Sequence, residues 1–139
     1  GMARAYFSTR FKAETGTTPH DYLTALRIQK ACLLLESGED LSVEQVACLV
    51  GFDPKNFSRQ FKKQMGKTPN EYIIELRLRF AKNMLSGTNM SIKQISEHIG
   101  YNDPYFFSRM FKKHMGLSPK EYRKILLKYY CEHSPLHLV

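Results

Sequence analysis

Two stretches of the chain carry cationic side chains at matching positions, each with an arginine followed by a pair of lysines. A guanidinium group can pair bidentately with two acceptors in one plane, such as the edge of guanine, whereas an ammonium group neutralises a phosphate as a point charge. These residue types in this pattern favour the binding of a polyanion. The cations are Arg59, Lys62 and Lys63 in the first stretch and Arg109, Lys112 and Lys113 in the second.

The composition agrees with an anionic partner. Lysine and arginine number 21 against 13 aspartates and glutamates, which gives a formal charge of +8 over 139 residues. A chain of this length forms one domain or two very small ones. Cys32, Cys48 and Cys131 are odd in number and far apart, which argues against a disulfide framework or a zinc finger. The absence of a long apolar run and of a signal-peptide pattern argues against a membrane location, so we expect a cytoplasmic protein.

Both cationic stretches belong to a repeat. Residues 57–72 read F-S-R-Q-F-K-K-Q-M-G-K-T-P-N-E-Y, and residues 107–122 read F-S-R-M-F-K-K-H-M-G-L-S-P-K-E-Y. A weaker copy, F-S-T-R-F-K-A-E-T-G-T-T-P-H-D-Y, occupies residues 7–22, so the period is fifty residues. A fixed period indicates that one structural unit recurs along the chain.

Each cationic stretch follows the signature of two short helices joined by a glycine turn. Ser42 and Gln45 form a capping box, Gly51 ends that short helix, and Asp53-Pro54 opens the next one. The same order returns in the second unit, with Ser91, Gln94, Gly100 and Asp103-Pro104. We therefore predict helix-turn-helix units over residues 42–65 and 91–115. No segment alternates apolar and polar residues as a strand would, so the predicted fold class is all-α.

A long helix over residues 68–86 should join the two units. Leu78, Ala81 and Leu85 repeat the apolar stripe of Ile28, Ala31 and Leu35. At about 1.5 Å per residue the helix would be roughly 28 Å long. Successive major grooves on one face of B-form DNA lie about 34 Å apart. The second helix of a helix-turn-helix, called the recognition helix, can lie in the major groove of DNA. Two such helices at the ends of this linker could therefore enter adjacent grooves.

The spacing of the phenylalanines predicts which residues face DNA. Phe57 and Phe61 are four residues apart and should face the core, as should Phe107 and Phe111, which turns the polar residues between them outward. We expect the phosphate contacts to come from the lysines and from two helix N-termini. The expected base-reading residues are Lys55, Asn56, Ser58, Arg59, Tyr105, Phe106, Ser108 and Arg109. The expected phosphate-binding residues are Ser42, Lys62, Lys63, Ser91, Lys112 and Lys113.

These motifs resemble the AraC/XylS family of bacterial transcription regulators. The resemblance rests on L-R-I-Q-K-A-C-L-L-L, L-S-V-E-Q-V-A-C-L-V-G-F and the two copies of the F-S-R motif, and it covers residues 20–125 densely. Asn102 lengthens the second turn by one residue, as in the second motif of that family. The resemblance implies seven helices, two helix-turn-helix units and a rigid linker helix. It also implies RNA polymerase as a partner and an effector or sensor domain outside this chain.

The predicted organisation has three parts. Residues 1–19 form a partial repeat with a recognition-like helix, residues 20–125 form the DNA-binding domain, and residues 126–139 form the end of the last helix and a tail. The expected function is sequence-specific binding of double-stranded DNA for transcription regulation. A second interpretation is a helical-repeat module that binds protein or RNA through its basic face. We find no nucleophile, acid-base pair, phosphate loop, metal site or cofactor motif, so we expect no enzyme.

The N-terminal copy lacks the first helix of its unit, which should leave Phe7 and Phe11 exposed. Three hypotheses account for it: the chain is part of a longer regulator, the helix acts as an N-terminal brace, or the helix mediates a homodimer. Direct contact of Arg4, Arg10 and Lys12 with DNA is a further alternative.

Overall fold

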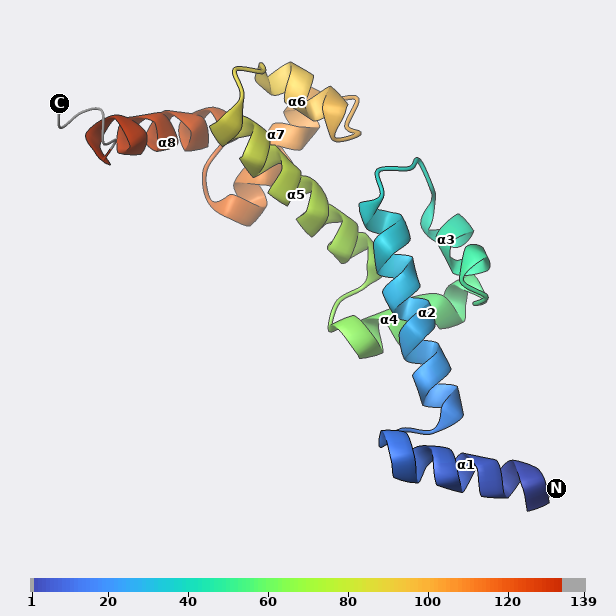
Figure 1. The fold of residues 1–139 in the computed structure, drawn as a ribbon. Helices are drawn as coiled ribbons and strands as arrows, with labels where there is room; N and C mark the ends of the chain where they lie inside the picture. Colours follow the sequence, from blue (N-terminus) through green and yellow to red (C-terminus); the bar gives the residue numbers. More distant parts are fainter. Residues whose placement is uncertain (1, 134–139) are drawn as a thin grey trace. The chain divides into compact units, whose positions relative to one another are not determined.

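The computed structural model describes residues 2–133, and within them the fold consists of eight helices without a strand (Figure 1). The prediction of an all-α fold with tandem helix-turn-helix units is confirmed. The last helix ends at His133. The helices are α1 (Met2–Thr15), α2 (Pro19–Glu36), α3 (Val43–Leu49), α4 (Pro54–Met65), α5 (Pro69–Gly87), α6 (Ile92–His98), α7 (Pro104–Met115) and α8 (Pro119–His133).

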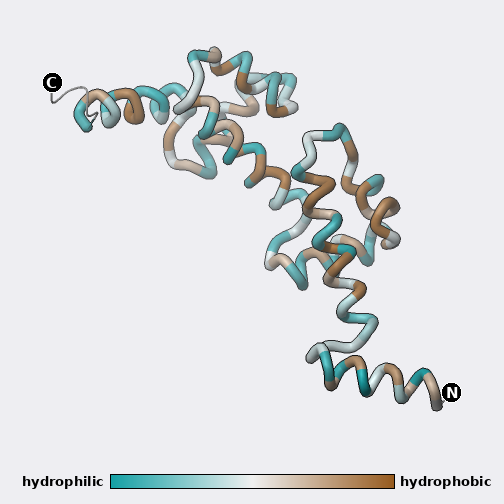
Figure 2. Tube along the Cα trace, in the orientation of Figure 1, coloured by the Kyte–Doolittle hydropathy of each residue, from teal (hydrophilic) through white to brown (hydrophobic). Residues whose placement is uncertain are grey.

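The chain divides into two compact units, one up to Ile73 and the other from Ile74 onward. In the first unit α3 and α4 pack on α2, and in the second α6 packs on α7. Along these helices hydrophobic positions recur between hydrophilic ones, which is the pattern of a helix with one buried face (Figure 2). Each unit therefore has a core of its own.

The helix starts follow the capping chemistry of the sequence. Ser42 accepts a hydrogen bond from the Gln45 amide at 3.1 Å, and the Gln45 side chain accepts one from the Ser42 amide at 2.8 Å. Ser91 and Gln94 form the same reciprocal pair at the start of α6. Such a box satisfies two amides that a helix N-terminus leaves without a partner. The two short helices α3 and α6 are thus fixed at their first turns.

The core of the first unit is built around two phenylalanines of α4. Phe57 and Phe61 are fully buried, and their rings lie 5.6 Å apart. They belong to one apolar cluster with Ile28 of α2 and Val46 of α3. The Phe61 ring also meets the ring of Tyr72 edge-on at 5.5 Å, a favoured arrangement for aromatic pairs. The inner face of α4 is therefore held by both preceding helices and by the start of α5.

The second unit repeats this core. Phe107 and Phe111 of α7 are fully buried with ring centroids 5.9 Å apart, and Phe111 meets Tyr122 at 5.5 Å. They share a cluster with Leu78 of α5 and Ile95 of α6. The second unit thus positions α7 as the first positions α4.

An arginine lies beneath the turn of each helix-turn-helix. Gly51 has φ +85°, and a Cβ atom there would approach the guanidinium carbon of Arg27 to 3.5 Å. The same guanidinium carbon lies 5.6 Å from the centre of the Phe52 ring, within the range of a cation–π contact. Arg77 lies in the same way 4.9 Å from the Tyr101 ring, next to Gly100 at φ +96°. Glycine is required at these turns because L side chains rarely adopt that φ.

The units differ in how the next helix, α5 after α4 or α8 after α7, is attached. In the first unit the Tyr72 hydroxyl donates a hydrogen bond to the Glu36 carboxylate at the end of α2. Burial and this carboxylate raise the pKa of Tyr72 well above its usual value. In the second unit the Arg123 guanidinium donates to backbone carbonyl oxygens of Met90 at 2.6 Å and Leu85 at 3.1 Å. Arg123 therefore ties α8 to the end of α5 and to the loop before α6.

The buried phenylalanines give a direct test of the core. We expect Phe57→Ala to lower the free energy of unfolding by about 3–5 kcal/mol, because it leaves a cavity in a fully buried site. The matched control is Phe7→Ala, at the same repeat position but 58% exposed, which should cost less than about 1 kcal/mol. Urea denaturation measures both. Equal losses in the two variants would contradict this description of the core.

Candidate nucleic-acid interface

The outer face of α4 carries cations that project away from the core. Because Phe57 and Phe61 bury the inner face, Lys55, Ser58 and Arg59 are exposed. Lys62 and Lys63 are exposed in the last turn of the same helix. This face therefore presents a guanidinium near the middle of the helix and ammonium groups near its end.

Asn56 differs from its sequence-based prediction. It is half-buried rather than fully outward, because it directly precedes Phe57 and lies at the flank of the buried face. Its side-chain oxygen accepts a hydrogen bond from Arg59 Nη2 at 3.4 Å. The contact is long, and the remaining N–H groups of Arg59 keep their capacity to donate.

The outer face of α7 combines aromatic and cationic side chains. Tyr105 is 81% exposed and Phe106 is 50% exposed, whereas Ser108 is half-buried. The Phe106 ring contacts the ring of Tyr101 at 5.8 Å, which fixes it beside the turn. Arg109 is exposed one position after Ser108. The first turn of this helix thus presents apolar contact area, and the guanidinium follows it.

Within residues 2–133, no carboxylate forms an ion pair with the exposed cations of α4 and α7. Those cations are Lys55, Arg59, Lys62, Lys63, Arg109, Lys112 and Lys113. Unpaired surface cations remain available to phosphates, since no internal partner competes for them.

Three other arginines are used inside the structure. Arg27 and Arg77 lie against the aromatic rings of the two turns, and Arg123 donates to backbone carbonyl oxygens. All three are half-buried. The sequence reasoning did not identify these roles. An arginine on the long helix, followed by a glycine-aromatic pair 23 or 24 residues later, was the signal available in the sequence.

The two serines predicted to bind phosphate lie at the first turns of α3 and α6. Ser42 and Ser91 are exposed, but the hydroxyl of each already accepts a backbone hydrogen bond within its capping box. Each hydroxyl still has its own proton to donate, so an anion at these termini could accept hydrogen bonds from the serine hydroxyl as well as from backbone amides.

The family model of the helix-turn-helix domain matches the chain twice, over residues 1–72 and 53–125. A crystal structure of a transcriptional regulator with an AraC-type DNA-binding domain, from Chromobacterium violaceum, aligns at 31% identity and a TM-score of 0.67. The alignment covers 78% of this chain and 94% of that one. The chain belongs to the AraC-type helix-turn-helix family. The AraC-type domain is a DNA-binding domain of transcription regulators and not an enzyme.

The chain is also similar to two further transcription regulators. The transcriptional regulator MtrA of Neisseria gonorrhoeae is 45% identical over 51 residues, which is 37% of this chain and 17% of MtrA. The DNA-binding domain of AdpA, a global transcriptional factor solved in complex with a target DNA, has the same fold with a TM-score of 0.63. That alignment has 24% identity and covers 81% of this chain and 96% of the AdpA domain. The aligned part of this chain thus spans about a sixth of the length of MtrA.

Other kinds of site receive no support from the described residues. Among residues 2–133, no group of three His, Cys, Asp or Glu side chains could hold a metal ion. Cys131, His133 and His137 lie close together in the sequence and could at most form an opportunistic metal site, and His137 lies outside the described residues. In the same range, no helix is both long and apolar enough to cross a membrane.

The lysines of the AraC-type domain should contribute to DNA affinity without regard to sequence. We expect Lys62→Ala to weaken binding to any duplex and to lower the slope of log affinity against log salt by about 1, because one phosphate contact is lost. The matched control is Lys128→Ala, an exposed lysine of α8. A salt titration of binding by fluorescence anisotropy measures both. An unchanged slope for Lys62→Ala would remove Lys62 from the interface.

Proposed function

We propose that α4 and α7 are two recognition helices that read two separate elements of one DNA duplex, each in a major groove. The observation that carries this proposal is the duplicated outer face. In both units an exposed arginine lies on the helix face opposite a buried pair of phenylalanines. A single chain can then read a complete DNA site, and the sequence of that site need not be two-fold symmetric. Membership of the AraC-type family and the fold shared with the DNA-bound AdpA domain support this assignment.

Arg59 and Arg109 carry the strongest base discrimination in this proposal. A guanidinium can donate two hydrogen bonds to O6 and N7 of guanine, and each such pair contributes about 1–3 kcal/mol of discrimination. Lys55, Asn56 and Ser58 read neighbouring base edges from α4, and Asn56 also orients Arg59 through their hydrogen bond. On α7, Ser108 supplies a hydroxyl, while Tyr105 and Phe106 supply apolar contacts that suit thymine methyl groups.

Phosphate contacts position the two helices on the duplex. The lysine pairs in the last turns of α4 and α7 neutralise phosphates beside the grooves that these helices enter. The first turns of α3 and α6, at Ser42 and Ser91, approach the backbone through amide groups. The lysines of this set are Lys62, Lys63, Lys112 and Lys113.

The regulator as a whole uses this domain to bring other functions to DNA. We assign RNA polymerase as a partner because the family regulates transcription. We also assign an effector or sensor domain outside this sequence, since the aligned part covers only 17% of MtrA. The three cysteines are free thiols, which suits a reducing cytoplasm.

Selection from a randomised duplex library tests the two-element proposal. We expect enrichment of two short elements about one helical turn apart. Arg59→Ala should then relax the preference at one element only, by about 1–3 kcal/mol, and Arg109→Ala should do the same at the other. Each variant serves as the control for the other. The preferences are measured by competition binding against duplexes substituted in one element at a time.

Two outcomes would contradict the proposal. Binding of equal strength to a scrambled duplex that disappears with salt would leave only the phosphate contacts. If either arginine variant weakened the sequence preference at both DNA elements, the variants would act through the stability of the protein rather than through contact with a base. In the first case a helical-repeat module that binds protein or RNA through its basic face becomes the better account.

A further inference from the structure

The corner between α1 and α2 has the geometry of the corner that follows each recognition helix. The ring centroids of Phe7 and Phe11 lie 5.8 Å apart, compared with 5.6 Å for those of Phe57 and Phe61. Phe11 meets the ring of Tyr22 edge-on at 5.5 Å and 74°, and Phe61 meets Tyr72 at 5.5 Å and 71°. The helix α1 is therefore built like a recognition helix and is attached like one.

This corner differs from its two counterparts in exposure. Phe7 is 58% exposed, whereas Phe57 and Phe107 are 0% exposed. Large apolar side chains continue the exposed surface along the first turns of α2. We name this surface the N-terminal corner; its exposed residues are Phe7, Tyr22, Leu23 and Leu26. Phe11, which the sequence predicted to be exposed, is half-buried because its ring contacts those of Phe7 and Tyr22. A cluster of large exposed apolar side chains marks a docking site, because water is a poor solvent for it.

The chain itself shows what covers such a surface. In the first unit, Phe57 and Phe61 are buried by a long helix that contributes Ile28 and Ala31 and a short helix that contributes Val46. In the second unit, α5 and α6 supply the corresponding aliphatic residues around Phe107 and Phe111. Small and branched aliphatic side chains on a long-helix/short-helix pair therefore fit this aromatic geometry twice within one molecule.

We propose that the N-terminal corner docks a further pair of helices, one long and one short, that resembles α2 and α3 and so completes a third helix-turn-helix. Within residues 2–133, the pairs of this type already cover α4 and α7. This inference goes beyond the proposed reading of two DNA elements and does not depend on it. The partner is a helical protein segment with an aliphatic stripe spaced as Ile28, Ala31 and Leu35 are.

A second copy of this chain does not offer that occupant. Its α2–α3 pair already covers α4, and its α6 already covers α7. The helix α8 holds the repeat position of α2 and α5, but Lys128 stands where Ile28 and Leu78 are buried. A charged side chain at the centre of the stripe would be left without a partner against two phenylalanine rings.

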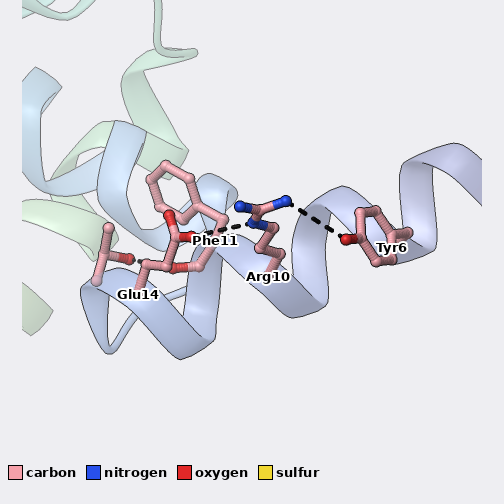
Figure 3. A network of polar contacts seen from close by, with 5 residues as sticks. Tyr6, Arg10, Phe11 and Glu14 are labelled. Carbon is pink, nitrogen blue, oxygen red and sulfur yellow. Dashed lines mark hydrogen bonds and ion pairs between the residues drawn. The ribbon is translucent and has the colours of Figure 1, made fainter.

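DNA is also a weaker occupant for α1. Ala5 and Thr9 stand at the repeat positions of Lys55 and Arg59, so two of the cations that mark α4 are missing. Arg10 donates to the Glu14 carboxylate at 3.0 Å and to the Tyr6 hydroxyl at 3.4 Å, and Figure 3 shows it between these two side chains. Its charge is therefore already paired on the surface of α1.

The test supplies the missing helix pair within the same chain. A copy of residues 18–52 is placed directly before Ala3, which preserves the fifty-residue period. We expect the amides of α1 to exchange with solvent at least about tenfold more slowly than in the unmodified chain, because the new pair buries Phe7. Hydrogen exchange followed by mass spectrometry measures this. The matched control carries Ile28→Lys in the added copy, which imitates α8, and its α1 should exchange as fast as in the unmodified chain.

Three results would overturn the proposal. The first is unchanged exchange of α1 in the extended chain, or equal protection in the Ile28→Lys control. The second is a dimer of the unmodified chain in sedimentation velocity that Phe7→Ser dissociates, since the occupant would then be a second copy. The third is a DNA footprint that shortens by about one helical turn when Arg4 and Lys12 are changed to alanine, because α1 would then bind DNA.

Discussion

The packing of two phenylalanines on the inner face of α4 and of α7 determines what the outer face of each helix presents. Phe57 with Phe61 and Phe107 with Phe111 are buried by the two preceding helices and meet a tyrosine of the following helix. A helix fixed on three sides cannot rotate about its axis without exposing a phenylalanine ring. The orientation of Arg59 and Arg109 toward solvent thus follows from aromatic packing on the opposite face, and the proposed DNA recognition depends on that packing.

The glycine turn that precedes α4 and its counterpart that precedes α7 are the second constraint. Arg27 and Arg77 lie against the aromatic residues of the turns, and Arg123 holds α8 through backbone carbonyl oxygens. These half-buried arginines stabilise the units that carry the exposed ones. The basic composition therefore has two physical origins, since part of the charge maintains the fold and part remains available to phosphates and bases.

Much of the fold could be predicted from the sequence, because its signals are local. The capping boxes at Ser42 and Ser91, the glycine turns and the four-residue spacing of the phenylalanines each specify a short segment, and the fifty-residue period repeats the result. The half-burial of Asn56 and Ser108 could not be predicted, because helical periodicity assigns a face but not the tilt of a helix against its neighbours. The hydrogen bond from Tyr72 to Glu36 joins residues far apart in sequence and leaves no local signal.

The central proposal is that one chain reads two DNA elements, one with α4 and the other with α7. The most direct measurement is the affinity for a series of duplexes in which the two selected elements are moved apart or together one base pair at a time. This account predicts a sharp optimum near one helical turn and a loss of about tenfold or more when the spacing changes by half a turn, because both helices then cannot enter their grooves together. Affinity that does not depend on spacing would contradict it.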